Sequence, residues 1–295
     1  MIPPGSLSSF VTAQDGLKLH VQEWGPRGAD GLPVVCLPGL ARTVADFEPL
    51  ATALADDRAC PRRVLALDSR GRGKSEYDRK AGNYTLEVEL ADLLAVLTAL
   101  EIGTAVFVGT SRGGILIMLL GAARPTALAG CVLNDIGPVI EPEGLARIKG
   151  YVGRLPQPVS FKDGAVILRK LFGSQFTALQ ESDWLAFARR TFREEGDRMV
   201  PNYDVKLATI LQEVDLERPL PALWKEFDSL ARVPMMVIRG DNSDILSVVT
   251  VEAMRRRRES LELVTVADQG HAPLLADSAT IGRIAGFIKE CDARA

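Results

Sequence analysis

Short hydrophobic runs alternate along the chain with longer segments of mixed polarity. The runs are V-V-C-L from Val34, V-L-A-L from Val64, A-V-F-V from Ala105, C-V-L from Cys131, M-M-V-I from Met235 and L-E-L-V-T-V from Leu261. They are almost continuously apolar, as strands buried on both faces need to be. This alternation predicts an α/β fold with a mostly parallel sheet covered by helices.

Two further segments have clear periodicity. Residues 17–24, L-K-L-H-V-Q-E-W, alternate between apolar and polar, which predicts a strand at an antiparallel edge. Residues 86–100 carry apolar side chains at helical spacing, behind Thr85 as an N-cap and with acidic residues in the first turn. Gly103 follows, where a helix stop is expected.

The alternation of short apolar runs and mixed segments stops between Pro138 and Leu230, where no run typical of a buried strand occurs. The helix-like segments of this stretch are G-A-V-I-L-R-K-L-F, W-L-A-F-A-R-R-T-F and A-L-W-K-E-F-D-S-L. We therefore expect a helical insertion at 138–230 between two strands of a core formed by 1–137 and 231–295.

Composition narrows the class of protein. The chain has 295 residues, of which 47% are hydrophobic and 25% charged, and a net charge of -3. These values are typical of a soluble globular protein and give no electrostatic reason to expect nucleic acid as a partner. The run Arg255–Arg258 is expected on the solvated face of a helix.

Targeting and redox signals point to the cytoplasm. The opening M-I-P-P-G-S lacks a leader pattern, and the longest apolar stretch, 113–123, is too short to cross a bilayer. The four cysteines are scattered and never form C-x-x-C, which predicts free thiols in a reducing compartment and no zinc site.

The segment G-T-S-R-G places Ser111 between a predicted strand and a predicted helix. Glycines on both sides permit a sharp turn that projects the hydroxyl clear of the sheet edge. This pattern predicts a nucleophile, with an ordinary helix-capping serine as the alternative. A serine nucleophile needs a histidine base oriented by a carboxylate.

The chain has two histidines. His271 follows the last apolar run, on a loop where a base could reach Ser111. His20 lies in the alternating strand, and we expect it to be a half-exposed strand residue.

Several carboxylates could orient His271. Asp241 and Asp244 lie on the loop after M-M-V-I-R-G, and Asp135 ends the strand before the insertion. Asp68 also ends a strand, but its loop, D-S-R-G-R-G-K-S, is crowded with basic residues. We expect Asp68 to be a structural ion-pair and turn residue.

Backbone donors for an oxyanion are also expected. The N–H of Arg112, directly after the serine, is one donor. The loop L-P-G-L after the first long hydrophobic run offers the N–H of Leu40 as the other.

Together these motifs resemble the α/β-hydrolase superfamily over nearly the whole chain. The resemblance implies an α/β-hydrolase fold in which the insertion is a cap, and no metal or cofactor. It implies Ser111, Asp244 and His271 as the catalytic set, with Asp241 and Asp135 as alternative acids. Many members have H-G where this chain has Pro38-Gly39, and an apolar or amide side chain where it has Arg112. We expect the Arg112 guanidinium to pair with Asp135, or alternatively to contact an anionic substrate.

A serine nucleophile implies an acyl-enzyme and excludes the superfamily's dehalogenases and epoxide hydrolases, which use a carboxylate. The favoured substrate is a small to medium, partly apolar ester or lactone. A carbon–carbon bond hydrolase of a ring-cleavage product and a ligand-binding sensor with little turnover are the alternatives. Aromatic residues of the insertion that could line a pocket are Trp184, Phe187, Phe192, Trp224 and Phe227.

Overall fold

The computed structural model describes residues 5–212, 214–216, 218 and 220–294. Residues 1–4, part of the opening without a leader pattern, lie outside the described residues. Eight strands form one sheet in the order β1-β2-β4-β3-β5-β6-β9-β10. Their bounds are β1 Ser6–Thr12, β2 Lys18–Trp24, β3 Val34–Leu37, β4 Val64–Leu67, β5 Ala105–Thr110, β6 Leu128–Asn134, β9 Met235–Gly240 and β10 Glu262–Val266. The α/β fold expected from the hydrophobic runs is confirmed.

The sheet is parallel from β4 to β10 and antiparallel at the edge formed by β1 and β2. The alternating segment 17–24 therefore does form an antiparallel strand near the edge. The strand β1, which lies outside it, is an element that the sequence analysis did not identify.

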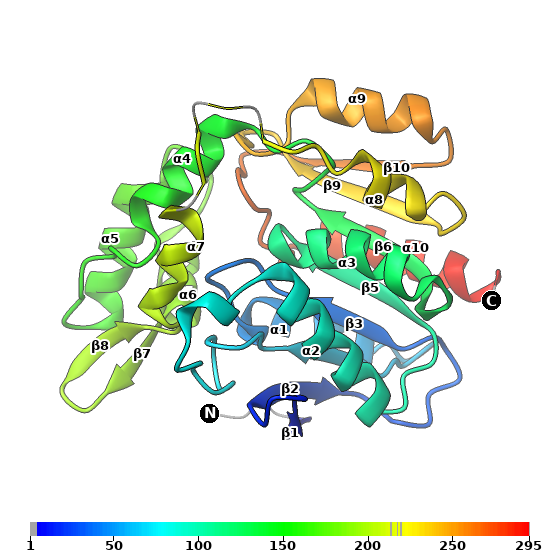
Figure 1. Ribbon diagram of the computed structural model, residues 1–295, viewed down its shortest axis with the longest axis horizontal. Coiled ribbons are helices and arrows are strands. Elements are labelled where there is room, and N and C mark those ends of the chain that lie inside the picture. Colours follow the sequence, from blue (N-terminus) through cyan, green and yellow to red (C-terminus); the bar gives the residue numbers. More distant parts are fainter. Residues whose placement is uncertain (1–4, 213, 217, 219, 295) are drawn as a thin grey trace.

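Helices cover both faces of the sheet (Figure 1). On one face lie α2 (Leu86–Ala99), α3 (Arg112–Ala123) and α9 (Val248–Arg257), and on the other lie α1 (Glu48–Ala55) and α10 (Ser278–Asp292). Successive strand residues alternate between the two hydrophobic cores: Val35 and Leu37 join the first, and Val34 and Cys36 join the second. Both faces of the sheet are buried, which explains why the strand sequences are apolar at nearly every position.

The segment between β6 and β9 forms a lobe beside the sheet, seen at the left of Figure 1. Its elements are α4 Pro142–Tyr151, α5 Phe161–Phe172, α6 Glu181–Thr191, β7 Phe192–Glu195, β8 Arg198–Pro201 and α7 Ala208–Gln212. The sequence predicted a helical insertion. The antiparallel pair β7–β8 shows that the insertion also contains two strands. A separate aromatic core, including Phe172, Phe176 and Trp184, holds α5 and α6 together.

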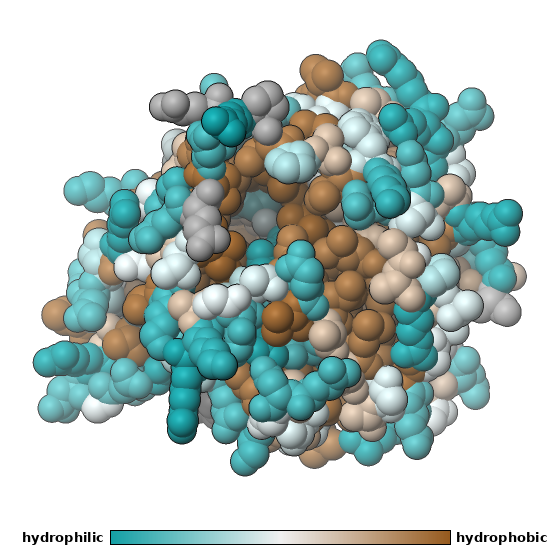
Figure 2. Space-filling view, viewed as in Figure 1, coloured by the Kyte–Doolittle hydropathy of each residue, from teal (hydrophilic) through white to brown (hydrophobic). Residues whose placement is uncertain are grey.

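The helix α8 (Trp224–Ser229) lies against α3 and joins the core layer rather than the lobe. Ser229 Oγ lies 3.4 Å from the Met118 carbonyl oxygen, and Leu230 packs against Gly121. Hydrophobic side chains gather on this face of the molecule, near the middle of Figure 2. Across the described residues, no helix combines the length and apolar character needed to span a membrane.

Candidate active site

Ser111 lies at a sharp turn between β5 and α3, with φ 51° and ψ -115°. Two glycines make this turn possible. A Cβ at Gly113 would lie 2.0 Å from the Leu37 carbonyl oxygen, and one at Gly109 would lie 2.6 Å from the backbone of Gly113. The helix therefore packs directly on the strands, and Ser111 is held in a strained conformation at the carboxyl end of β5.

His271 and Asp135 complete a hydrogen-bonded series with Ser111. The Nε2 atom of His271 lies 2.8 Å from Ser111 Oγ, and its Nδ1 atom lies 2.8 Å from Asp135 Oδ2. Asp135 is fully buried and also accepts hydrogen bonds from Gly240 N (2.9 Å) and Ser243 Oγ (2.6 Å). A carboxylate at Nδ1 favours the tautomer with the proton on Nδ1, which leaves Nε2 free to accept the serine proton.

The expectation that Asp244 orients His271 is wrong. Asp244 is instead held by Arg147 of α4 in a two-point ion pair at 2.6 and 2.8 Å. Burial raises the pKa of Asp244, but hydrogen bonds from Arg147 and Gln175 and attraction to Arg147 and His271 together outweigh it, so the net pKa is lowered. Asp241, the second choice, is 64% exposed and lies 3.9 Å from Arg239. Asp135, the remaining alternative, is the carboxylate that contacts the imidazole.

Leu40 lines the pocket that contains Ser111, and Arg112 follows Ser111 in the chain. A buried network of ion pairs and hydrogen bonds holds both segments. Arg112 Nε donates to Glu89 Oε2 at 2.7 Å, so its expected pairing with Asp135 is wrong. The other Glu89 oxygen accepts from Arg72 Nη1 at 2.7 Å, and Arg72 Nε donates to the Leu40 carbonyl oxygen at 2.8 Å. One buried carboxylate thus connects the two backbone segments expected to bind the oxyanion.

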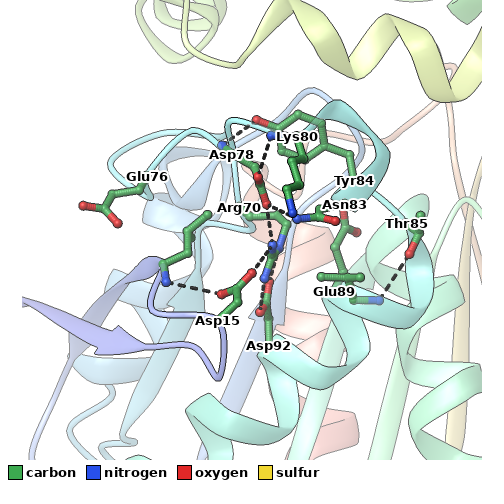
Figure 3. A network of polar contacts seen from close by, with 12 residues as sticks. Asp15, Arg70, Glu76, Asp78, Lys80, Asn83, Tyr84, Thr85, Glu89 and Asp92 are labelled. Carbon is green, nitrogen blue, oxygen red and sulfur yellow. Dashed lines mark hydrogen bonds and ion pairs between the residues drawn. The ribbon is translucent and has the colours of Figure 1, made fainter.

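A neighbouring ion-pair network anchors the loop that carries Arg72 (Figure 3). Arg70 makes two 2.7 Å contacts with Asp92 of α2 and further contacts with Asp78 (2.7 Å) and Asp15 (2.9 Å). Burial opposes the charge on Arg70, but Asp92 and Asp15 outweigh it and raise its pKa. The arginines of this loop are therefore structural cations.

A second serine, histidine and aspartate set lies on the other side of this loop. Ser8 Oγ is 2.8 Å from His20 Nε2, and His20 Nδ1 is 2.7 Å from Asp68 Oδ2. His20 is fully buried, so the expectation of a half-exposed residue is wrong. Asp68 also accepts from the backbone N–H groups of Val44 and Lys74, which confirms its predicted structural role. The pocket that opens at Ser111 is not lined by these side chains.

That pocket lies between the core and the lobe. Apolar side chains form much of its wall, among them Ile148, Val152, Leu168, Phe172, Phe176 and Phe187. Of the five insertion aromatics suggested by sequence, Phe187 alone lines it. Trp184 and Phe192 belong to the core of the lobe, whereas Trp224 and Phe227 pack on the α3 side of the sheet. The polar pocket residues Arg42, Tyr151 and Tyr203 were not predicted from sequence. Tyr151 lies in α4, where periodicity does not distinguish a pocket wall from a core, and Arg42 and Tyr203 lie in connecting segments without periodicity.

Other sequence predictions concern the surface and the thiols. All four cysteines are free. Arg255, Arg256 and Arg257 are exposed on α9, whereas Arg258 is buried and donates to the Leu230 carbonyl oxygen. In the described part of the chain, no group of three His, Cys, Asp or Glu residues is arranged to hold a metal ion.

Comparison with known proteins shows the family of the chain. Residues 34–282 match the model of the alpha/beta hydrolase family. This chain belongs to that family. This alpha/beta hydrolase is 31% identical to a 3-hydroxybutyrate-oligomer hydrolase of Cupriavidus necator over 271 residues, which cover 90% of each chain.

Solved structures of other alpha/beta hydrolases are similar along nearly their whole length. An alpha/beta hydrolase from Novosphingobium aromaticivorans has 38% identity and a TM-score of 0.87, with 97% of this chain and 98% of that chain covered. E-2-(acetamidomethylene)succinate hydrolase has the same fold, with 22% identity, a TM-score of 0.80 and coverage of 96% and 99%.

Proposed function

We propose that this alpha/beta hydrolase cleaves carboxylic esters through an acyl-enzyme on Ser111. The observation that carries the proposal is the series Ser111–His271–Asp135, with both hydrogen bonds at 2.8 Å, beside a largely apolar pocket. A serine hydroxyl gains nucleophilicity when an oriented imidazole can take its proton.

In the proposed mechanism, Ser111 Oγ attacks the ester carbonyl while His271 Nε2 takes the hydroxyl proton. Asp135 holds the imidazole and stabilises its positive charge. The N–H groups of Leu40 and Arg112 bind the oxyanion, and His271 then protonates the leaving alcohol. A water activated by His271 attacks the acyl-enzyme and releases the acid, which regenerates Ser111.

The pocket supports a small to medium, partly apolar ester or lactone. The similarity to a protein named as a 3-hydroxybutyrate-oligomer hydrolase supports an ester of a short acid. The Arg112 guanidinium does not support the carbon–carbon hydrolase alternative, because it is only 12% exposed and is bound to Glu89. We also propose that the lobe formed by the insertion at 138–230, without α8, acts as a cap over Ser111, since α4, α5 and α6 all contribute to the pocket wall.

The test is hydrolysis of 4-nitrophenyl butyrate by the wild type and by Ser111→Ala and His271→Ala. We expect turnover in the wild type, a butyryl adduct on Ser111 detectable by mass spectrometry, and loss of both in each variant. Tight ligand binding without turnover or adduct would favour the sensor alternative instead.

A further inference from the structure

A cluster of three charged residues lies where the core meets the lobe beside Ser111. Arg42 donates to both oxygens of Asp46, from Nε at 2.6 Å and from Nη2 at 2.5 Å. Arg190 of α6 lies 3.7 Å from the same carboxylate. The side chains of Arg42, Asp46 and Arg190 are only 21%, 23% and 15% exposed. These charges are therefore largely shielded from solvent.

The cluster has more positive than negative charge. Among the described residues, Asp46 is the carboxylate within ion-pair distance of either guanidinium, so two cations share one anion. The Nε atom of Arg190 is buried without a hydrogen-bond partner there. Burial and the neighbouring charge of Arg42 lower the pKa of Arg190, and attraction to Asp46 and, more weakly, to Glu48 and Asp183 does not fully offset them. A partly buried cation whose charge is not fully compensated is stabilised when a further anion binds beside it.

Of the two arginines, Arg42 is the one that lines the pocket. Its Cγ atom and the Cβ atom of Ser111 lie on the same side of Gly39, at 3.5 and 3.6 Å from the position of a Cβ there. Its guanidinium carbon lies 4.7 Å from the ring centre of Phe187, and Nη1 donates to Thr191 Oγ1 at 2.7 Å. Phe187, Thr191 and Arg42 all line the pocket that contains Ser111.

Arg42 also has N–H groups to spare. A guanidinium has five N–H donors, and among the described residues the three hydrogen bonds to Asp46 and Thr191 leave two on the terminal nitrogens. Asp46 fixes the plane of the guanidinium, while Arg190 offsets part of the negative charge of Asp46. A planar, oriented guanidinium with free N–H groups is suited to bind a carboxylate.

We propose that Arg42 forms a subsite for a free carboxylate of the substrate, so that the preferred esters are anionic, such as monoesters of short dicarboxylic acids or esters of short acids that keep a free carboxylate. This inference rests on the proposed ester hydrolysis at Ser111 and names its substrate class. The apolar wall then contacts the chain between the carboxylate and the ester.

The test compares monoethyl glutarate with diethyl glutarate, both followed by ethanol release. We expect the wild type to prefer the monoester in kcat/KM by about tenfold or more, the size of a charge-assisted hydrogen bond. Arg42→Met together with Asp46→Asn removes one cation and one anion, so the net charge of the cluster is unchanged while Arg190 stays in place, and it should abolish this preference. Arg256→Met removes an arginine that is 80% exposed on α9 and should preserve it.

Failure of the subsite and failure of the proposed hydrolysis are distinguishable. Ser111-dependent turnover of the diester with no preference for the monoester would overturn the subsite and leave the ester hydrolysis intact. If neither ester is turned over, calorimetric binding to Ser111→Ala decides. Tighter binding of the monoester, lost in the Arg42→Met/Asp46→Asn background, supports the subsite; equal binding of both esters, or no binding of the monoester, overturns it.

Discussion

His271 Nδ1 lies 2.8 Å from Asp135 Oδ2, although the two residues are 136 positions apart in the chain. Asp135 follows β6, the strand next to the one that carries Ser111. The backbone N–H of Ser111 donates to the carbonyl oxygen of Asn134, the residue directly before Asp135. The acid and the serine are thus fixed to each other by the sheet itself, and the loop after β10 brings the imidazole between them.

Replacing Asp135 with asparagine should lower kcat for 4-nitrophenyl butyrate by about 10⁴-fold, because an amide favours the wrong tautomer of His271. Asp244→Asn removes the carboxylate that binds Arg147 and should change kcat by less than about tenfold. Steady-state kinetics of the two purified variants provide the comparison. A larger loss in Asp244→Asn than in Asp135→Asn would contradict the assignment.

A fluorophosphonate probe should label Ser111 and leave Ser8 unmodified. Both serines contact a histidine paired with a buried aspartate at nearly equal distances. Only Ser111 also has the pocket and the helix-terminal N–H groups that a tetrahedral adduct needs. Peptide mapping of the adduct, with Ser111→Ala and Ser8→Ala as matched controls, checks this; a Ser8 adduct at comparable rate would refute it.

Glu89→Gln should lower kcat by about tenfold with little change in KM, because Arg72 and Arg112 lose the carboxylate that connects the two oxyanion segments. Affinity for a trifluoromethyl ketone should fall in parallel, a change that loss of stability alone does not cause. Asp92→Asn is the control. Asp92 lies on the same helix as Glu89 and forms a buried ion pair with Arg70, but it does not contact Leu40 or Arg112. Equal loss of kcat in both variants would mean that Glu89 acts only through the fold.

The Asp244–Arg147 pair should stabilise the protein at neutral pH and not in acid. The pKa of Asp244 is lower in the folded protein than its ordinary value of 3.8. The contribution of Asp244 to the free energy of unfolding is therefore complete above pH 3.8, and it is lost as the pH falls through the lower pKa of the folded protein. Urea unfolding should show Asp244→Asn less stable than the wild type by about 1 kcal/mol at pH 7, with a smaller difference below about pH 4. A difference that is constant with pH would contradict this.

Gly113→Ala should destabilise the protein by about 3 kcal/mol or more, because its Cβ would lie 2.0 Å from the Leu37 carbonyl oxygen. Gly286→Ala is the matched control. Gly286 lies exposed in α10 with no atom within 4 Å of its Cβ position, and alanine there should stabilise the helix by up to about 1 kcal/mol. Thermal unfolding of the two variants measures both effects; an unchanged melting temperature in Gly113→Ala would show that α3 can move away from β3.

Much of the fold could be predicted because its signals are local. Each parallel strand was marked by an apolar run, and Thr85 caps α2 as expected, accepting from the N–H of Val88. The hairpin β7–β8 was missed because F-R-E-E and R-M-V-P are short and have no clear alternation. Their strand form depends on pairing with each other and on burial of Phe192 and Met199 in the core of the lobe.

The sequence by itself determined the parallel strands, the turn at Ser111 and the choice of His271 as the base, since each depends on residues within one strand, turn or loop. Only the tertiary structure decided the partners of the charged side chains. Asp244 was close enough to the strand end to serve as the acid, but Arg147 of α4 binds it, while the order β5-β6-β9 places Asp135 against His271. The physical reason is that hydrogen bonds between distant segments depend on which strands become neighbours, and no periodicity along the chain encodes that order.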